Sequence, residues 1–259
     1  MPGNSGKAKF ILQERDCRLL KEIGEMRIID REQSMLVANF GSITRANSRL
    51  LKLTRAGYLN RFFVGTIPGG RKSDYTLSAR GAQAVGAVAA GISRRFSTTV
   101  LGDLFVEHQT QINEIYLTLK YRARPESATL LRWSTFRETL TAGSKLIPDG
   151  YLELDSPVGV RPAFLEVDLG HETLRIWQQK VRSYLHLAIS GDFGRLFPQH
   201  QFRVLVVANS ARRLEGIRKV VAKQTDKIFW LSNLETINRI GFWSPVWLRP
   251  RGDQMLTLI

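Results

Sequence analysis

A stretch near the middle of the chain constrains the fold more than any other part. Residues 146–184 read LIPDGYLELDSPVGVRPAFLEVDLGHETLRIWQQKVRSY. Two apolar segments with alternating side chains predict two strands, and the turn-rich DSPVGVRP between them predicts a hairpin. After Gly170 the apolar residues recur with the period of a helix. Strand, hairpin, strand and helix in this order predict an α/β domain.

Three carboxylates and one amine lie on these elements. Because side chains alternate along a strand, Glu166 and Asp168 are expected on one face together with Phe164. Asp149 follows a proline that cannot donate to a strand ladder, so it is expected at an edge or bend that a neighbouring strand approaches. Lys180 is expected at the margin between the apolar and polar faces of the helix.

Such a group of acids predicts a metal site. Carboxylates a few ångström apart do not all stay ionised without a cation, and oxygen ligands without Cys or His spacing favour Mg²⁺ or Mn²⁺. Asp149, Glu166 and Asp168 are therefore the candidate metal ligands. A bound ion can activate water and stabilise the charge on a phosphate, with Lys180 as a further positive charge. The three acids and Lys180 are the candidate catalytic residues for hydrolysis of a phosphodiester.

The same residues resemble the PD-(D/E)xK nuclease superfamily and, more narrowly, the replication-relaxation family of plasmids and other mobile elements. Pro148-Asp149 matches the first half of the motif, and the segment 166–168 lies where the second half is expected. Asp168 occupies the position of the motif lysine, and Lys180 resembles a migrated substitute. Lys180 and Tyr184 together are similar to the Q-x-x-x-Y helix signature of RecB-like members.

The resemblance implies a restriction-endonuclease-like α/β domain with a central mixed sheet. In that interpretation Asp149 and Glu166 hold the ion, Asp168 assists, and Lys180 supports the attacked phosphate or orients water. Three further acids are candidates to complete the site, although surface or loop positions are the simpler expectation: Glu107, Glu114 and Glu138.

Each of these residues also has an ordinary structural interpretation. Pro-Asp at a strand end is typical of a turn, which would account for Asp149. Alternating apolar and charged residues are typical of a half-exposed strand, which would account for Glu166 and Asp168. Lys180 can extend along the helix with its amine in water.

The charge of the chain predicts a polyanionic partner. The formal net charge is +15, and the first 97 residues hold 17 Lys and Arg against 7 Asp and Glu. A chain with this excess repels itself unless the charge is used or screened, so double-stranded DNA is the expected partner.

The basic N-terminal part has its own signature. A helix is expected over 14–26, a second capped by Asp30, and a third capped by Ser42 and ending at Arg55. After a turn at Gly57, two strands flank the glycine-rich TIPGGRKS. Three helices and a hairpin resemble a winged helix-turn-helix domain.

The resemblance implies DNA contacts from the third helix and the hairpin tip. The residues expected to face outward from the helix or to lie on the tip are Ser42, Thr44, Arg45, Asn47, Arg49, Arg71 and Lys72. Such a domain can also mediate protein contacts, with the arginines forming a solvated face.

The remaining sequence predicts further elements of the C-terminal domain. QFRVLVVAN predicts a strand buried on both faces, and Ser210 is expected to cap a basic helix that is either a phosphate-binding track or a solvated face. KIFWLS predicts another strand and the tail an edge strand. Residues 87–97 are the expected boundary, which gives a winged-helix domain at 1–97 and a nuclease-like domain at 98–259.

Composition excludes several classes. A lone Cys17 allows no disulfide within the chain, the four histidines lack metal-ligand spacing, and no apolar run is long enough to span a bilayer. A cytoplasmic protein without membrane association is expected.

Two functions remain open. One is a DNA-binding, Mg²⁺- or Mn²⁺-dependent endonuclease or nickase of a plasmid or other mobile element. The other is a non-catalytic DNA-binding regulator of replication or transcription that retains a nuclease-like fold. A homodimer and the replication or transfer proteins of the element are candidate partners.

Overall fold

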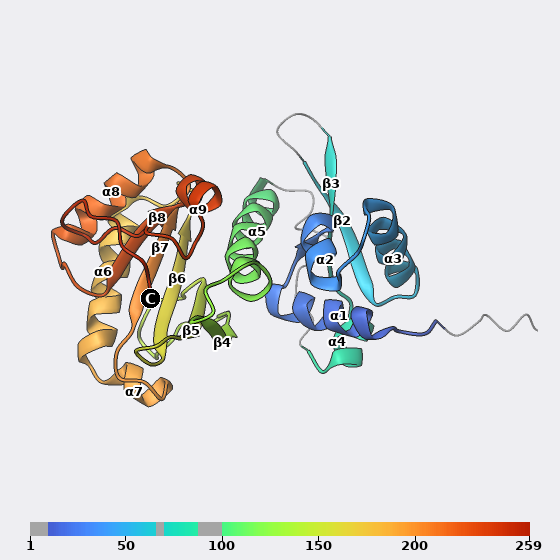
Figure 1. Cartoon of the computed structure of the whole chain (residues 1–259), viewed down its shortest axis with the longest axis horizontal. Helices are drawn as coiled ribbons and strands as arrows, with labels where there is room; N and C mark the ends of the chain where they lie inside the picture. The colour runs from blue at the N-terminus through green and yellow to red at the C-terminus, as the bar shows by residue number, and fades with distance from the viewer. Residues whose placement is uncertain (1–9, 66–69, 88–99) are drawn as a thin grey trace, which may run out of the picture. The chain divides into compact units, whose positions relative to one another are not determined.

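The N-terminal unit contains short helices and an antiparallel sheet of three strands. Its elements are α1 (Glu14–Met26), β1 (Ile29–Asp30), α2 (Arg31–Ala38), α3 (Ile43–Arg55), β2 (Leu59–Gly65), β3 (Arg71–Leu77) and α4 (Ala79–Val85) (Figure 1). The strand order is β1-β3-β2, and β2 and β3 form the predicted hairpin. This computed structural model describes residues 10–65, 70–87 and 100–259, so the hairpin tip lies outside the described part.

Local signals place these helices where the sequence predicts them. The side chain of Asp30 accepts a hydrogen bond from the Gln33 amide at 2.7 Å and caps α2. Ser42 caps α3 in the same way, by accepting from the Arg45 amide at 3.3 Å. Gly57 then adopts a φ of +78°, a conformation that glycine allows without strain, and the chain turns into β2.

Helix α5 (Val100–Tyr121) contains the division between the two units, which fall at Met1–Glu114 and Ile115–Ile259. The sequence predicts this division between residues 97 and 98, within a segment that is mostly outside the described residues. The structure differs because polar side chains in the middle turns of α5 bond to the N-terminal unit.

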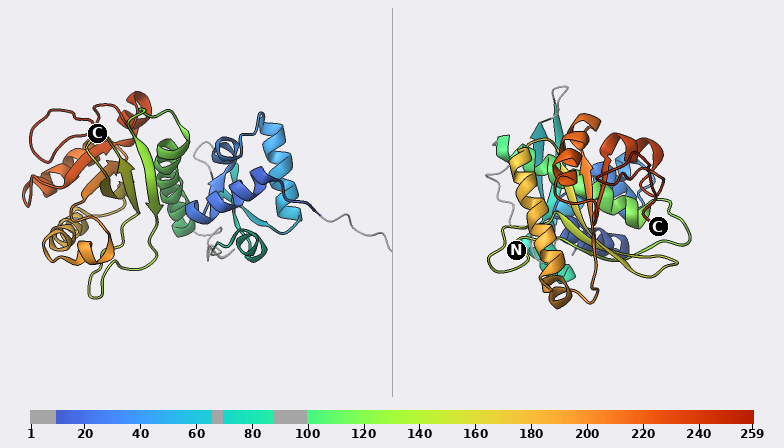
Figure 2. Two further views of the ribbon diagram at one scale, coloured as in Figure 1. Left: turned by 60° about the horizontal axis from the view of Figure 1, so that its bottom comes forward. Right: turned by 90° about the vertical axis from the view of Figure 1, so that its left-hand side faces the viewer.

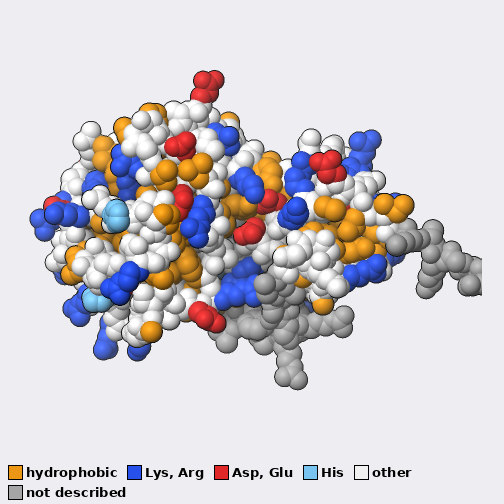
Figure 3. Space-filling view, turned by 90° about the horizontal axis from the view of Figure 1, so that it is seen from below, with side chains coloured by type: hydrophobic (Ala, Val, Ile, Leu, Met, Phe, Trp, Pro, Cys, Tyr) orange, Lys and Arg blue, Asp and Glu red, His pale blue; other side chains and the backbone are white. Residues whose placement is uncertain are grey.

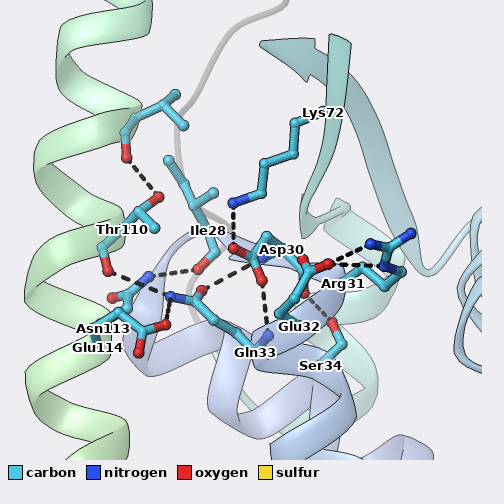
Figure 4. Close-up of polar contacts among 11 residues, drawn as sticks. Ile28, Asp30, Arg31, Glu32, Gln33, Ser34, Lys72, Thr110, Asn113 and Glu114 are labelled. Carbon is cyan, nitrogen blue, oxygen red and sulfur yellow. Dashed lines mark hydrogen bonds and ion pairs between the residues drawn. The ribbon is translucent and has the colours of Figure 1, made fainter. Parts of the chain in front are cut away.

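These bonds join α5 to the residue just before β1 and to the helix α2 (Figure 4). Asn113 donates to the carbonyl oxygen of Ile28 at 2.7 Å, and the Gln33 amide donates to Glu114 at 2.9 Å and to the Thr110 carbonyl at 3.3 Å. Buried polar groups need such partners. The first part of α5 therefore belongs to the N-terminal unit.

The C-terminal unit is a mixed α/β domain around one five-stranded sheet. After α5 its elements are β4 (Thr129–Ser134), β5 (Gly150–Asp155), β6 (Arg161–Asp168), α6 (Leu174–Ile189), α7 (Asp192–Leu196), β7 (Arg203–Ala208), α8 (Ala211–Ala222), β8 (Phe229–Asn233) and α9 (Leu234–Ile240). The strand order is β4-β5-β6-β7-β8. The first three strands are antiparallel, and β6, β7 and β8 are parallel. The predicted central mixed sheet is thus confirmed.

Helices α6 and α8 cover one face of this sheet (Figures 1 and 2). Trp177 and Val181 of α6 and Ile217 of α8 are fully buried against Phe164 of β6 and Val206 of β7. Every residue of β7 after the first is buried, as predicted for a strand covered on both faces. Burial of these apolar side chains is the main stabilising term of the unit.

The C-terminal tail is not the predicted edge strand. It forms isolated bridges only, between Leu231 and Leu248 and between Trp247 and Leu256. Trp247 is buried and donates its indole N–H to the Phe242 carbonyl at 3.0 Å, so the tail packs as a loop. Among the described residues, no helix combines the length and the apolar character needed to cross a membrane.

Candidate functional site

Glu166 and Asp168 lie on the face of β6 that α6 covers. The ring of Phe164, on the same face, lies 5.5 Å from the ring of Tyr184, and Trp177 donates its indole N–H to Asp168 at 2.6 Å. The predicted alternation along β6 is therefore confirmed. Both carboxylates are buried, with 0% and 2% of their surface exposed.

Glu166 is held by two side chains of α6. One of its oxygens accepts from the ammonium of Lys180 at 2.8 Å and the other from the hydroxyl of Tyr184 at 2.6 Å. Lys180 also contacts Glu172, in the loop before α6, at 2.9 Å. Lys180 and Tyr184 are four residues apart and so occupy one side of the helix.

Asp149 joins this cluster from the start of the hairpin. Its side chain accepts a hydrogen bond from the Val167 amide at 2.7 Å, and its own amide donates to the Leu165 carbonyl at 3.2 Å. Its charge acts on Glu166 and Lys180. The structure therefore brings together three of the four predicted catalytic residues. We refer to Asp149, Glu166, Lys180, Glu172 and Tyr184 as the β6–α6 cluster.

The protonation of the cluster follows from its burial. Burial raises the pKa of Glu166 to about 7, and Asp149 acts in the same direction against the opposing effect of Lys180. Burial alone would lower the pKa of Lys180, but Glu166, Asp149 and Glu172 raise it above its usual value. Burial also raises the pKa of Tyr184 well above its usual value. At neutral pH the amine is charged and the phenol is neutral.

Asp168 does not join the β6–α6 cluster, contrary to the prediction. Arg213 of α8 donates to both of its oxygens, from Nε at 2.6 Å and from Nη2 at 2.7 Å. The Gly170 amide and the indole of Trp177 complete its shell, at 2.7 and 2.6 Å. Burial tends to raise the pKa of Asp168, yet these bonds lower it below the usual value. Asp168 is a structural anion that joins β6, α6 and α8.

The arrangement does not fit a divalent cation held by the three predicted acids. Both oxygens of Glu166 accept from α6, and Asp168 is saturated by Arg213, Trp177 and Gly170. Within the described ranges, no three Asp, Glu, His or Cys side chains are grouped so that they can hold a metal ion. The ammonium of Lys180 supplies the positive charge that the acids require.

The additional acids lie elsewhere. Glu114 accepts from Gln33 and belongs to the N-terminal unit, as does the exposed Glu107. Glu138 is exposed on the loop that follows β4. Sequence reasoning missed Glu172, whose only signal is its position just before the N-cap of α6. For the basic helix α8 the sequence left a phosphate-binding track and a solvated face open, and Arg213 of this helix instead pairs with Asp168.

The predicted DNA-contacting residues divide into two groups. Thr44, Arg45 and Asn47 are exposed on α3, and Arg71 is exposed at the start of β3. No described residue forms an ion pair or a side-chain hydrogen bond with the guanidinium group of Arg45 or Arg71. Ser42 uses its hydroxyl as the cap of α3.

Arg49 and Lys72 differ from the prediction because acids hold them. Arg49 forms a bidentate ion pair with Asp16. Asp16 is fully buried, and only 14% of the Arg49 side chain is exposed. Lys72 lies in β3 instead of on the tip, and its amine contacts the capping Asp30. These two cations therefore fix α3 and the hairpin in place.

Two basic hollows flank α3. One lies between α2, α3 and the hairpin and is lined by Arg31, Glu32, Asn47, Leu51, Arg61, Arg71, Lys72, Ser73 and Tyr75. The other lies between α1 and α3 and includes Arg15, Thr44, Arg45, Ser48 and Lys52. The exposed side of α3 is thus bordered by positive charge on both sides.

Fold and site together define a protein with a basic helical unit followed by a mixed α/β unit that carries a buried Glu–Lys–Tyr cluster. The chain belongs to the replication-relaxation family, whose model matches residues 20–199. The description of that family indicates a role in the replication or relaxation of plasmids and other mobile elements. Searches of curated proteins and of solved structures found no match.

Proposed function

We propose that this protein is a non-catalytic DNA-binding factor in the replication or relaxation of a mobile element. Its N-terminal unit acts as a winged helix on double-stranded DNA. The C-terminal unit serves as a PD-(D/E)xK-like scaffold. Its element order is helix, three antiparallel strands, helix and parallel strand. The observation that carries the proposal is the exposed side of α3, where Asn47 lines one basic hollow and Arg45 lines the other.

The geometry of α3 suits the major groove. Thr44, Arg45 and Asn47 are close to the N-terminus of the helix, and Arg and Asn side chains can each make paired hydrogen bonds to base edges. Arg71, at the end of the hairpin next to its tip, would contact backbone phosphates. Figure 3 shows Lys and Arg side chains spread over the viewed face of the molecule, in keeping with the net charge of +15.

The first prediction concerns α3 and the hairpin. Arg45→Ala and Arg71→Ala are each expected to weaken binding to a short fluorescein-labelled duplex roughly tenfold, because each removes a positive charge that no described acid neutralises. Arg18→Ala, which removes an exposed arginine from α1, is the matched control and should bind like wild type. Fluorescence anisotropy measures all four affinities.

Salt dependence provides a second measurement in the same experiment. Phosphate contacts release counterions, so the affinity of wild type should fall steeply with salt, and each variant should have a shallower slope by about one. Affinities that are equal in wild type and both variants, or that do not change with salt, would refute the DNA-binding role of this unit.

A second candidate is an endonuclease or nickase at the β6–α6 cluster. It is favoured by the convergence of Asp149, Glu166 and Lys180 in the order of the nuclease motif. Two features argue against it, because a catalytic metal ion would need free carboxylate oxygens. Both oxygens of Glu166 are occupied by α6, and Asp168 pairs with Arg213 instead of facing the cluster.

The second prediction separates the two candidates. Supercoiled plasmid incubated with the full chain in Mg²⁺ or in Mn²⁺ is expected to stay supercoiled, because the carboxylates that a metal would need are engaged within the protein. Agarose electrophoresis gives the readout, with Glu166→Gln as a control for contaminating nucleases. Nicking by wild type that Glu166→Gln and Lys180→Met both abolish would establish the nuclease and overturn the non-catalytic role.

A further inference from the structure

Three arginines converge on the face of the central sheet that lies opposite α6. Phe164, Val204 and Phe229 belong to the core under α6 and α8. Because side chains alternate, Arg161 of β6, Arg203 of β7 and Trp230 of β8 take the other face. Ala163 pairs with Arg203 and Leu205 pairs with Trp230, so Arg161, Arg203 and Trp230 lie on a diagonal across the three adjacent strands, each two residues further along than the last.

A tryptophan organises this group, which we call the arginine cluster: Arg161, Arg203, Arg249 and Trp230. The guanidinium carbons of Arg203 and Arg249 lie 4.4 and 4.8 Å from the centroid of the Trp230 ring. Arg249 comes from the C-terminal tail, which is joined to β8 by the bridge between Leu231 and Leu248. Guanidinium groups stacked on an aromatic ring keep their N–H edges available for a ligand.

The three arginines of the cluster form no ion pair with a described acid, although the nearby Asp226 carboxylate acts on Arg249. Arg203 donates to the carbonyl oxygen of Leu258, and Arg249 donates to that of Asp226 at 2.9 Å. No described carboxylate forms an ion pair with Arg161, Arg203 or Arg249, and the buried Nε of Arg161 has no hydrogen-bond partner among the described residues. Other half-buried arginines of this unit differ, since Arg213 pairs with Asp168.

Burial and mutual repulsion both affect the pKa values within the cluster. Burial and the charges of Arg161 and Arg249 lower the pKa of Arg203 to about 10. Burial also lowers the pKa of Arg249, against the opposing effect of the Asp226 carboxylate. Three arginines are thus held together, and none of them forms an ion pair with a described carboxylate. An anion with several oxygens, such as a phosphate, would relieve this repulsion and match the planar donors of guanidinium.

We infer that Arg161, Arg203 and Arg249 form a phosphate-binding site in the C-terminal unit, and that it takes a backbone phosphate of bound DNA. The inference rests on the proposed DNA-binding function and adds a second DNA contact to it. The site lies on the face of the sheet away from the β6–α6 cluster and is separate from that cluster. Each of the four residues in the arginine cluster is partly exposed, so the cluster lies at the surface of the unit.

The most informative variant is Arg161→Gln. No described residue accepts a hydrogen bond from the side chain of Arg161, so its replacement leaves no described group without a partner and removes one of three repelling charges. The C-terminal unit should keep or slightly raise its urea midpoint, which tryptophan fluorescence reports because all five tryptophans follow residue 115. The affinity for a duplex should nevertheless fall about fivefold to tenfold, with a salt slope that is shallower by about one.

Two other variants complete the experiment. Arg203→Lys keeps the charge but loses the planar fork, so its affinity should lie between those of wild type and Arg161→Gln. Arg195→Gln removes an arginine with 73% of its side chain exposed and should bind DNA like wild type. Inorganic phosphate is a separate probe. It should raise the thermal midpoint of wild type relative to chloride at equal ionic strength, and it should do so less for Arg161→Gln.

The outcomes separate this site from the proposed winged helix. A loss of DNA affinity in Arg161→Gln, whatever Arg45→Ala does, supports the second contact. Wild-type affinity and salt slope in Arg161→Gln overturn it, even where Arg45→Ala weakens binding. If phosphate stabilises the protein through Arg161 but DNA affinity is unchanged, the site takes a small phosphate compound and the assignment to DNA is wrong.

Discussion

Replacing Lys180 with methionine is expected to destabilise the C-terminal unit by roughly 3 kcal/mol at pH 8. The Lys180 ammonium is the only cation within 4 Å of the Glu166 carboxylate among the described residues. Methionine preserves much of the side-chain volume and removes the charge. The buried Glu166 would keep only the hydroxyl of Tyr184, with Asp149 still repelling it.

The loss should depend on pH in a defined direction. Burial raises the pKa of Glu166 to about 7 even with Lys180 present, so without the amine it must rise further. A carboxyl whose folded-state pKa exceeds its unfolded value of about 4.3 binds more protons when folded. The stability of Lys180→Met should therefore fall as pH rises from about 5 to 8, more steeply than that of wild type.

Urea unfolding followed by tryptophan fluorescence at pH 6 and pH 8 measures both effects in the full chain. The double variant Lys180→Met with Glu166→Gln is the control, because a neutral amide needs no counter-charge. It should recover much of the lost stability at pH 8. Equal midpoints of wild type and Lys180→Met at both pH values would show that the ion pair contributes nothing to the fold.

Replacing Arg213 with methionine should cost about as much, roughly 3 to 4 kcal/mol at pH 7. The variant leaves Asp168 buried with the indole of Trp177 and the Gly170 amide as its remaining donors. It also removes the bond from Arg213 to the Glu172 carbonyl, at 2.6 Å. Arg212→Met, at the exposed neighbouring position on α8, is the matched control and should change stability by less than about 0.5 kcal/mol.

The loss in Arg213→Met should also shrink in acid, but over a lower pH range. The bonds of Asp168 lower its pKa below the usual value, so the stability they provide is complete above the unfolded pKa of about 3.9 and disappears as pH falls through the lower folded value. The difference between wild type and Arg213→Met should thus be largest near neutral pH and shrink towards pH 3. A difference that grows in acid would contradict the assignment of Asp168 as a paired anion.

Local patterns explain why much of the fold could be predicted from the sequence. The helix caps at Asp30 and Ser42 depend on bonds across three residues, and the shared face of Glu166 and Asp168 follows from strand geometry alone. The buried strand β7 follows from its apolar run. Such features involve only neighbours in the chain, so they are visible without a structure.

The partners of the charged side chains are much less predictable. Arg213 lies 45 residues from Asp168, and Arg49 lies 33 residues from Asp16. A sequence shows that such groups are present but not which opposite charge each one meets. The three acids therefore predict one shared cation, whereas Asp168 and Glu166 each have a different basic partner. The catalytic and metal-binding roles of these residues, and the DNA contacts of α3, stay predictions.

The bonds between α5 and the N-terminal unit bear on how this protein can be divided. A fragment that ended in the glycine-rich segment near residue 97 would lose Asn113 and Glu114. The carbonyl oxygen of Ile28 and the side-chain amide of Gln33 would then lose these partners and would need hydrogen bonds from water instead. Proteolytic or engineered excision of the N-terminal unit should therefore keep α5 as far as Glu114. A cut near residue 97 would remove a helix that the unit needs in order to fold alone.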